Sequence, residues 1–326
     1  ISGKAPSLFV EGSNGRIGQR LYLRGLGNTD FDIAASQPVA FFVDNIVREN
    51  SILKSFPLFD LESLTVLKGP QGSLYGRNST AGAVLVKTQE PQNEDSGSLK
   101  VALGSLGSST VEFVSNSALN ESLYTRTAIL SQHRDNWINN GYTGEQKSLA
   151  GFDDIALRTQ MLWSDDDGLN AKVALTARKL NGSAPMFRAN VLSTGSNDLN
   201  SNYDPDTVYT DQNYGSPQDY SLYGADIRLT YSIGDFELRS LTSHQYGKGN
   251  TSGDIDGGYG AVFLPEMGPG FIPFQSRSND AARVKEFSQE LSIKHSNEKH
   301  DIINGINIFR SSLSIESDLF YLPSAN

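Results

Sequence analysis

The sequence contains no cysteine, only four histidines and no long hydrophobic run. The absence of cysteine excludes a disulfide framework and thiol catalysis. The longest uninterrupted apolar run, Val39–Val43, is far shorter than the roughly 20 residues that a transmembrane helix needs. The net charge of −10 argues against a nucleic-acid partner, because binding to phosphates requires a basic surface.

Nucleotide-binding motifs are also missing, although the stretch Leu61–Thr88 is rich in glycine. Gly76 is followed by Arg77 and Asn78, so no Gly-Lys-Ser/Thr sequence closes a phosphate-binding loop. The stretch instead predicts a strand, a tight turn, one helical turn at Gln71–Tyr75, a loop and a second strand. Pro57, followed by residues 59–62, predicts a brief helix that leads into the first of these strands.

After residue 95 the sequence alternates between apolar and polar residues. Ile155, Leu157 and Met161 fall on one face of a predicted strand, with Arg158 and Gln160 on the other. Such runs of roughly ten residues have the length of a tilted strand that crosses a bilayer. Nine strands are predicted, at about 97–104, 107–118, 122–135, 152–164, 169–181, 220–233, 235–247, 284–295 and 300–313.

The connections between these strands alternate in length. Most of those at one predicted rim are long, at 136–151, 182–219 and 248–283, with only Ser105–Leu106 short. Those at the other rim are tight turns, at 119–121, 165–168, 234–235 and 296–299. Short turns at one rim and long loops at the other are typical of outer-membrane β-barrels.

The charge distribution and a polar stretch indicate a domain boundary. Residues 1–95 carry nine basic and ten acidic residues, whereas the remainder carries 18 and 27. The polar stretch Glu90–Gly97 coincides with this change and reads as a linker. We therefore expect one domain at 1–95 and another at 96–326.

The segment Val66–Thr88, VLKGPQGSLYGRNSTAGAVLVKT, resembles the plug-domain signature of TonB-dependent outer-membrane receptors. Other segments resemble the same family: LYLRGLG (21–27), VAFFVDN (39–45), FDLESLTVL (59–67) and EFSQELSIKHS (286–296). The chain departs from the family at Lys68, where Arg is usual, and at Asn45 and Ala81, where Gly is usual. A left-handed turn tolerates Asn.

The resemblance implies a mixed α/β plug domain followed by antiparallel transmembrane β-barrel strands. About nine strands do not enclose a 95-residue plug, since plugged transporters need about 22. An odd strand number also leaves an unpaired edge. No signal-peptide pattern is present at Ile1. We therefore expect an N-terminally truncated plug and the first part of an incomplete, C-terminally truncated barrel.

Two groups of plug residues are candidates for function. Loops that face the long-loop rim supply the ligand-binding candidates, although these residues equally suit bracing of the plug against the wall; they are Asn28, Asp30, Phe31, Asp32, Gln37, Arg48 and Asn50. Charged residues expected to contact the barrel are Arg24, Glu62, Lys68 and Arg77. Tyrosines in or beside the long loops, including Tyr203 and Tyr220, suit either stacking on a ligand ring or ordering of the loops.

No pattern in the sequence indicates catalysis or a bound metal. His295 and His300 flank a turn, where a metal site is less favoured than two solvated side chains. The acidic loop 197–219 lacks EF-hand spacing, which leaves weak Ca²⁺ binding open. We expect no enzyme activity, no cofactor and no resident metal.

The resemblance implies a multi-pass β-barrel in the outer membrane of a Gram-negative bacterium. Its partners would be outer-membrane lipid, a scarce small solute such as a ferric siderophore, and the TonB complex, which would contact a segment before Ile1. Saccharides, cobalamin and other chelates remain open as solutes, because specificity resides in loops. The alternatives are a soluble secreted β-rich ligand-binding module and a passive porin-like barrel.

Overall fold

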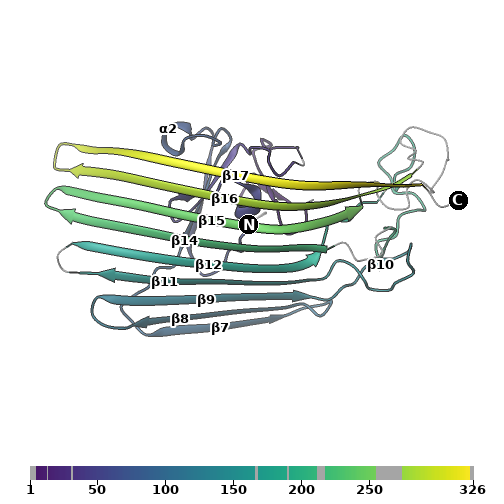
Figure 1. The fold of residues 1–326 in the computed structure, drawn as a ribbon, viewed down its shortest axis with the longest axis horizontal. Helices are drawn as coiled ribbons and strands as arrows, with labels where there is room; N and C mark the ends of the chain where they lie inside the picture. Colours follow the sequence, from purple (N-terminus) through teal and green to yellow (C-terminus); the bar gives the residue numbers. More distant parts are fainter. Residues whose placement is uncertain are drawn as a thin grey trace.

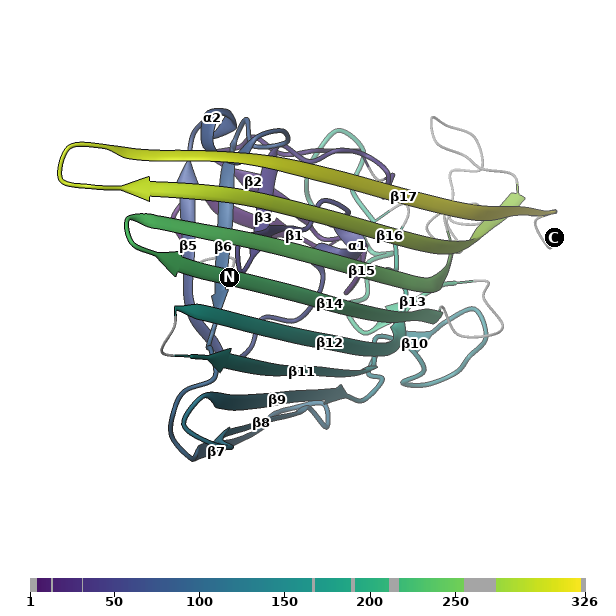
Figure 2. The same cartoon turned by 60° about the vertical axis from the view of Figure 1, so that its left-hand side comes forward.

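The computed structural model describes residues 5–12, 14–30, 32–165, 168–188, 191–210, 217–254 and 274–323. They form a small mixed domain, which we call the plug, and a large antiparallel sheet, which we call the wall (Figure 1). Figure 2 shows the plug against one face of the wall, with its strands β5 and β6 crossing the direction of the wall strands. Among these residues no helix is long or apolar enough to cross a bilayer.

The plug contains six short strands and two four-residue helices, α1 (Ser51–Lys54) and α2 (Gly72–Tyr75). Its main sheet has the order β4 (Ile46–Val47), β3 (Val39–Val43), β6 (Gly82–Thr88) and β5 (Leu61–Lys68), in which only β3 and β6 are parallel. A separate antiparallel pair consists of β1 (Leu8–Glu11) and β2 (Arg20–Leu23). The two sheets share one apolar core that includes Leu23, Val39 and Val84. The predicted helical turn and the strands on either side of it are confirmed.

A two-residue turn joins β3 to β4. Asp44 and Asn45 have φ values of 49° and 67°, the left-handed pair that a tight hairpin of this kind requires. Asn45 therefore adopts the conformation that its place in the sequence suggested. Gly82 is constrained differently, because a Cβ atom there would lie 2.2 Å from the Leu67 carbonyl oxygen.

One expected feature of the plug is wrong. The sequence after Pro57 suggests a brief helix at 59–62, but β5 begins at Leu61 and Asp60 has a φ of 50°. A left-handed residue cannot continue a right-handed helix. The helix lies earlier, at α1, where the Asn50 side chain accepts a hydrogen bond from the Ile52 backbone N–H at 2.9 Å.

The wall has nine strands, as predicted, each hydrogen-bonded to its neighbour in chain order. The outermost strands, β7 and β17, each have one neighbour, so the wall is an open part of a barrel. The strands are β7 (Ser96–Leu103), β8 (Ser109–Ala118), β9 (Leu123–Arg134), β11 (Phe152–Ser164), β12 (Leu169–Ser183), β14 (Pro217–Ile233), β15 (Phe236–Asp254), β16 (Phe274–Ser296) and β17 (Asp301–Pro323).

The two faces of the wall differ in polarity, as a membrane environment requires. The face away from the plug exposes apolar side chains, among them Ile155, Leu175 and Ile227. The face toward the plug buries polar ones, including Arg158 and Gln160. A soluble β-module buries its apolar rows, so this arrangement contradicts the soluble alternative.

Tight turns lie at the left-hand rim of the wall in Figure 1 and most long connections at the right-hand rim. Two of the long connections pair with each other through the parallel strands β10 (Asn139–Asn140) and β13 (Thr207–Val208). Ile138, Leu149 and Val208 form a small apolar cluster beneath this pairing. Two of the long connections at this rim therefore pack against each other and contain short strands.

The last strands are longer than predicted. β15 continues to Asp254 and β16 begins at Phe274, so much of the expected 248–283 loop is strand. The added segments contain many polar residues and glycines, so they lack the apolar alternation that identifies a lipid-facing strand. Pairing with the neighbouring strand extends them, as shown by Asp254 opposite Arg277.

Replacement of Leu175 by arginine tests the outward orientation of the apolar face. Leu175 lies in the middle of β12 and is half exposed. A charge at the bilayer midplane costs about 2–4 kcal/mol in a β-barrel, so we expect reduced insertion and a lower unfolding midpoint of the complete protein in lipid vesicles. The control is Glu121→Arg in a rim turn, where we expect a cost of about 0–1 kcal/mol. Equal effects of the two changes would contradict the orientation.

Candidate functional site

Buried ion pairs join the plug to the inner face of the wall. Asp60 of the plug accepts two hydrogen bonds from Arg126, at 2.9 and 2.5 Å, and lies 3.6 Å from Arg158. Arg158 also donates to the backbone carbonyls of Phe59 and Asp60, at 2.7 and 2.9 Å. The Asp60 side chain is only 4% exposed, so these partners replace nearly all of its water.

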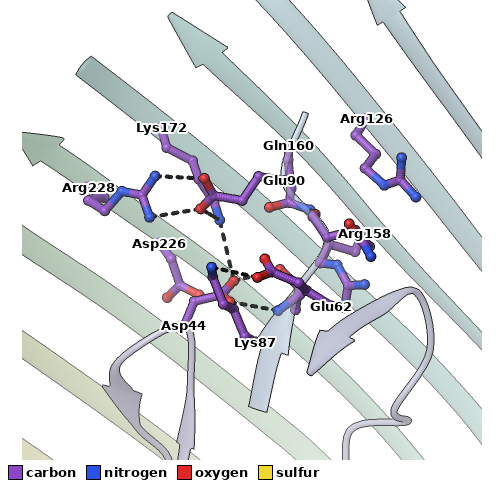
Figure 3. A network of polar contacts seen from close by, with 12 residues as sticks. Asp44, Glu62, Lys87, Glu90, Arg126, Arg158, Gln160, Lys172, Asp226 and Arg228 are labelled. Atoms are coloured by element: carbon purple, nitrogen blue, oxygen red, sulfur yellow. Dashed lines mark hydrogen bonds and ion pairs between the residues drawn. The ribbon is translucent and has the colours of Figure 1, made fainter. Parts of the chain in front are cut away.

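A second carboxylate, Glu90, bridges two wall cations (Figure 3). Lys172 donates to it at 2.9 Å, and Arg228 donates to both of its oxygens at 2.8 and 3.2 Å. Lys172 also lies 3.5 Å from Asp44, whose carboxylate accepts bonds from the Thr88 backbone N–H and hydroxyl. Burial by itself would raise the pKa of Glu90, but the bonds from Arg228 and the charge of Lys172 outweigh it and lower the pKa to about 2.

At other points of the interface the signs are reversed, because the plug supplies cations and the wall supplies carboxylates. Arg16 of the plug donates to Asp154 at 3.0 Å, a wall carboxylate that Arg178 also holds at 2.7 and 2.8 Å. Arg48 donates to Asp226 at 2.7 Å. The plug therefore has a basic part and an acidic part, each matched by the opposite sign on the wall.

A cavity of about 430 Å³ remains between plug and wall, lined in part by Arg16, Arg178 and Lys54. Lys54 is buried, and its ammonium group donates to the Val39 carbonyl at 3.5 Å. Burial lowers the pKa of Lys54 to about 8, against the opposing charges of Glu286 and Glu49. Lys54 is therefore a buried cation whose charge is only partly balanced by Glu286 and Glu49.

A separate cavity of about 350 Å³ lies where the plug loop that contains Asp32 meets the wall near the long-loop rim. Its lining includes the predicted ligand-binding residue Asp32 and Tyr220, one of the tyrosines that suit stacking on a ligand ring. Sequence reasoning missed Gln218 and Asp280, which also line it, because their place on the wall face depends on strand register. Its size and mixed lining suit part of a small solute.

The predicted ligand-binding residues fall into two groups. Asn28, Asp30 and Asp32 form successive turns, in which each side-chain oxygen accepts the backbone N–H two residues later, at 2.8, 2.9 and 2.8 Å. Asp30 and Asp32 are exposed and Asn28 is half-buried, so the series remains accessible to a solute. Phe31 lies outside the described residues.

Gln37, Arg48 and Asn50 are engaged inside the structure. Gln37 is buried and hydrogen-bonded to the backbone of residues 19 and 21. The backbone N–H of Asn50 donates to Glu286 of the wall at 2.7 Å, and Arg48 is paired with Asp226. These contacts fit the bracing alternative, and solute binding by these three residues remains a prediction that requires the plug to move.

The structure corrects the expected charge contacts of the plug. Glu62 pairs with Lys87 inside the plug at 2.8 Å, and Arg77 pairs with Glu49. Arg77 does reach the wall, where its guanidinium lies 5.0 Å from the centre of the Phe309 ring. Arg24 and Lys68 are exposed. The sequence contained a usable signal for the true wall partners, because Arg158, Lys172 and Arg228 occupy the polar positions of alternating strands.

Removal of the Asp60 carboxylate should release the plug. Asp60→Ala leaves Arg126 and Arg158 without their carboxylate, and loss of one partner from a buried ion pair costs about 3–5 kcal/mol. The matched control is Glu62→Gln, whose exposed pair with Lys87 is worth about 0–1 kcal/mol. The two variants are compared by the rate of protease cleavage of the plug and by its unfolding midpoint in guanidinium. Similar results for the two variants would show that the Asp60 contacts do not hold the plug.

Acid should weaken the Glu90 bridge. Because the folded pKa of Glu90 is depressed from 4.5 to about 2, its stabilising effect is present above pH 4.5 and is lost as the pH falls toward 2. With allowance for its partial exposure, we expect a loss of about 1–2 kcal/mol in that window. The urea midpoint of plug unfolding, measured between pH 5 and pH 2, gives the size of this loss. Glu90→Gln should flatten that part of the profile, and an unchanged profile would contradict the assignment.

Comparisons with known proteins agree with this architecture. The family model of the TonB-dependent receptor plug domain matches residues 1–83. The pesticin receptors of Yersinia enterocolitica and Yersinia pestis are 29% identical to this chain over 143 residues, which is 43% of this chain and 20% of theirs.

Solved receptor structures share the fold over nearly the whole chain. The ferric yersiniabactin uptake receptor FyuA from Yersinia pestis matches with a TM-score of 0.77 and 18% identity, over 98% of this chain and 46% of that protein. The ferric-catecholate import receptor Fiu from E. coli K12, in its open form, matches with a TM-score of 0.67 and 16% identity, over 94% and 45%.

The chain thus spans a fifth of the length of the pesticin receptors and just under half of these two solved receptors. The matched family model covers the plug, and the solved structures share both the plug and the strands of the wall. The wall has the outward apolar face and inward polar face that lipid requires. Residues 1–83 therefore match the TonB-dependent receptor plug domain, and the chain as a whole shares the fold of these solved receptors, with a plug against an incomplete wall of antiparallel strands.

Proposed function

We propose that this receptor binds a ferric siderophore at the cell surface and imports it into the periplasm by an energy-coupled rearrangement of the plug. The observation that carries the proposal is the ionic plug–wall interface. Carboxylates and cations are matched across it at Asp60, Glu90 and Arg48. Buried ion pairs gain little net stability over apolar packing but need good geometry. A displacement of the plug therefore weakens many of them together.

The relatives support the choice of solute. Two solved receptors that share the fold are described as taking up ferric yersiniabactin and importing ferric catecholates. We assign the first encounter with the solute to the accessible loop at Asn28, Asp30 and Asp32 and to the cavity of about 350 Å³ beside it. Movement of the plug would then bring in Gln37, Arg48 and Asn50.

We propose different roles for the two parts of the chain. We propose residues 1–95 as the plug and 96–326 as barrel wall, a boundary that falls between the end of β6 at Thr88 and the start of β7 at Ser96. The TonB complex would pull on a segment that precedes Ile1. The proposed role is binding and transport, without catalysis.

Uptake of radiolabelled iron in cells that carry the complete gene tests the proposal. We expect import of a ferric siderophore in a strain with TonB, and only surface binding in an isogenic strain without TonB or after a protonophore. A passive barrel predicts the same import in all three. Equal import would therefore overturn energy coupling and favour the porin-like alternative.

A further inference from the structure

The plug-facing side of four adjacent wall strands has an excess of positive charge. On β9, β11, β12 and β14 the inward positions carry two carboxylates, Asp154 and Asp226. The same positions carry six cations, which we call the cationic face: Arg126, Arg134, Arg158, Lys172, Arg178 and Arg228. Wall residues alone therefore leave this face with an excess of cations.

Register makes part of this excess unfavourable in the wall by itself. Lys172 on β12 stands directly opposite Arg228 on β14. Like charges in directly opposite positions destabilise a sheet. Glu90 lies between the two and is hydrogen-bonded to both, at 2.9 Å from Lys172 and 2.8 Å from Arg228. The pair is thus compensated by a carboxylate that belongs to the plug and not to the wall.

The other plug carboxylates act in the same way. Asp60 holds Arg126 and lies near Arg158, and Asp44 lies 3.5 Å from Lys172. Compensation is nevertheless incomplete. Among the described residues, the Arg158 Nε atom and the Gln160 Oε1 atom are buried without a hydrogen-bond partner. The inner face therefore has hydrogen-bonding groups that the docked plug does not satisfy.

The next two strands show that this excess is a local feature. On their inward positions β15 and β16 carry Arg239 and Lys294 together with four carboxylates, Glu237, Asp280, Glu286 and Glu290. Arg239 is paired with Glu290 at 2.7 Å. The positive face is thus confined to one side of the described wall, where it runs from Arg134 near the long-loop rim to Lys172 near the tight turns.

We propose that the cationic face is the track along which the solute passes, and that the solute is therefore an anionic iron chelate of catecholate or carboxylate type. This inference rests on the proposed function, since the face is uncovered only if the plug moves. When Asp44, Asp60 and Glu90 leave, Lys172, Arg126 and Arg228 lose the carboxylates that neutralised them. Anionic groups of the solute replace the plug carboxylates, whereas a neutral chelate offers no such exchange.

The test separates loss of the track from loss of plug anchoring. In the complete receptor, Arg228→Gln and Glu90→Gln are made singly and together. Each single change leaves charges at the Glu90 bridge without their full complement. The double variant keeps hydrogen-bonding side chains at both positions and leaves Lys172 with Asp44, but it has one cation fewer on the face. Protease cleavage of the plug in this variant shows that docking is retained. The matched control is Arg239→Gln with Glu290→Gln, a wall ion pair outside the cationic face.

Cells are given radiolabelled ferric complexes of tris-catecholate, carboxylate and neutral tris-hydroxamate type. We expect anionic complexes to be imported about tenfold or more faster than the neutral one. In the E90Q/R228Q variant that import should fall about threefold or more, with surface binding in de-energised cells unchanged. The control pair should leave import unchanged.

Two results would overturn the inference while leaving the proposed function intact. One is import of the neutral complex at the rate of the anionic ones. The other is import by the E90Q/R228Q variant at the wild-type rate, which would show that these groups only anchor the plug. Import of none of the complexes, with or without TonB, would instead contradict the proposed function. The inference that the solute passes along the cationic face would then fail as well.

Discussion

The structure depends on one constraint, which is that lipid cannot solvate the polar side chains of the wall. The polar positions of each strand must therefore face inward, where only the plug and enclosed water can satisfy them. Asp60 and Glu90 show how this is done. Glu90 accepts hydrogen bonds from Lys172 and Arg228 on two wall strands, and the Asp60 carboxylate accepts two from Arg126 and lies 3.6 Å from Arg158. Plug and wall are thus held together by matched charges at positions that the membrane dictates.

The plug adopts costly backbone conformations at its points of contact. Asp44 and Asp60 have φ values of 49° and 50°, and both carboxylates face wall cations. A left-handed conformation at a non-glycine residue costs roughly 1–3 kcal/mol and persists only where the surroundings impose it. At Asp44 the β3–β4 turn imposes this conformation, whereas at Asp60 the bonds from Arg126 hold the carboxylate against the wall.

Pairs of both polarities across the interface give the docked plug a defined position. Arg16 and Arg48 meet wall carboxylates, whereas Asp60 and Glu90 meet wall cations. A displacement of the plug would lengthen the favourable pairs of both kinds. The interface is therefore specific in register, and its many pairs respond together when the plug moves.

The sequence was sufficient to predict the wall strands, the tight turns and the strands on either side of the helical turn of the plug, because alternation and turn chemistry are local properties. It did not determine the partners of its charged residues. Glu62 looked like a contact to the wall, yet its ion pair lies inside the plug. Arg77 contacts Phe309 of the wall but forms its ion pair inside the plug, and Asp60 is held by arginines far along the chain. Only the tertiary structure decided these pairings, since the distance between two charges depends on strand register and on how the plug is seated, and neither is encoded in adjacent residues.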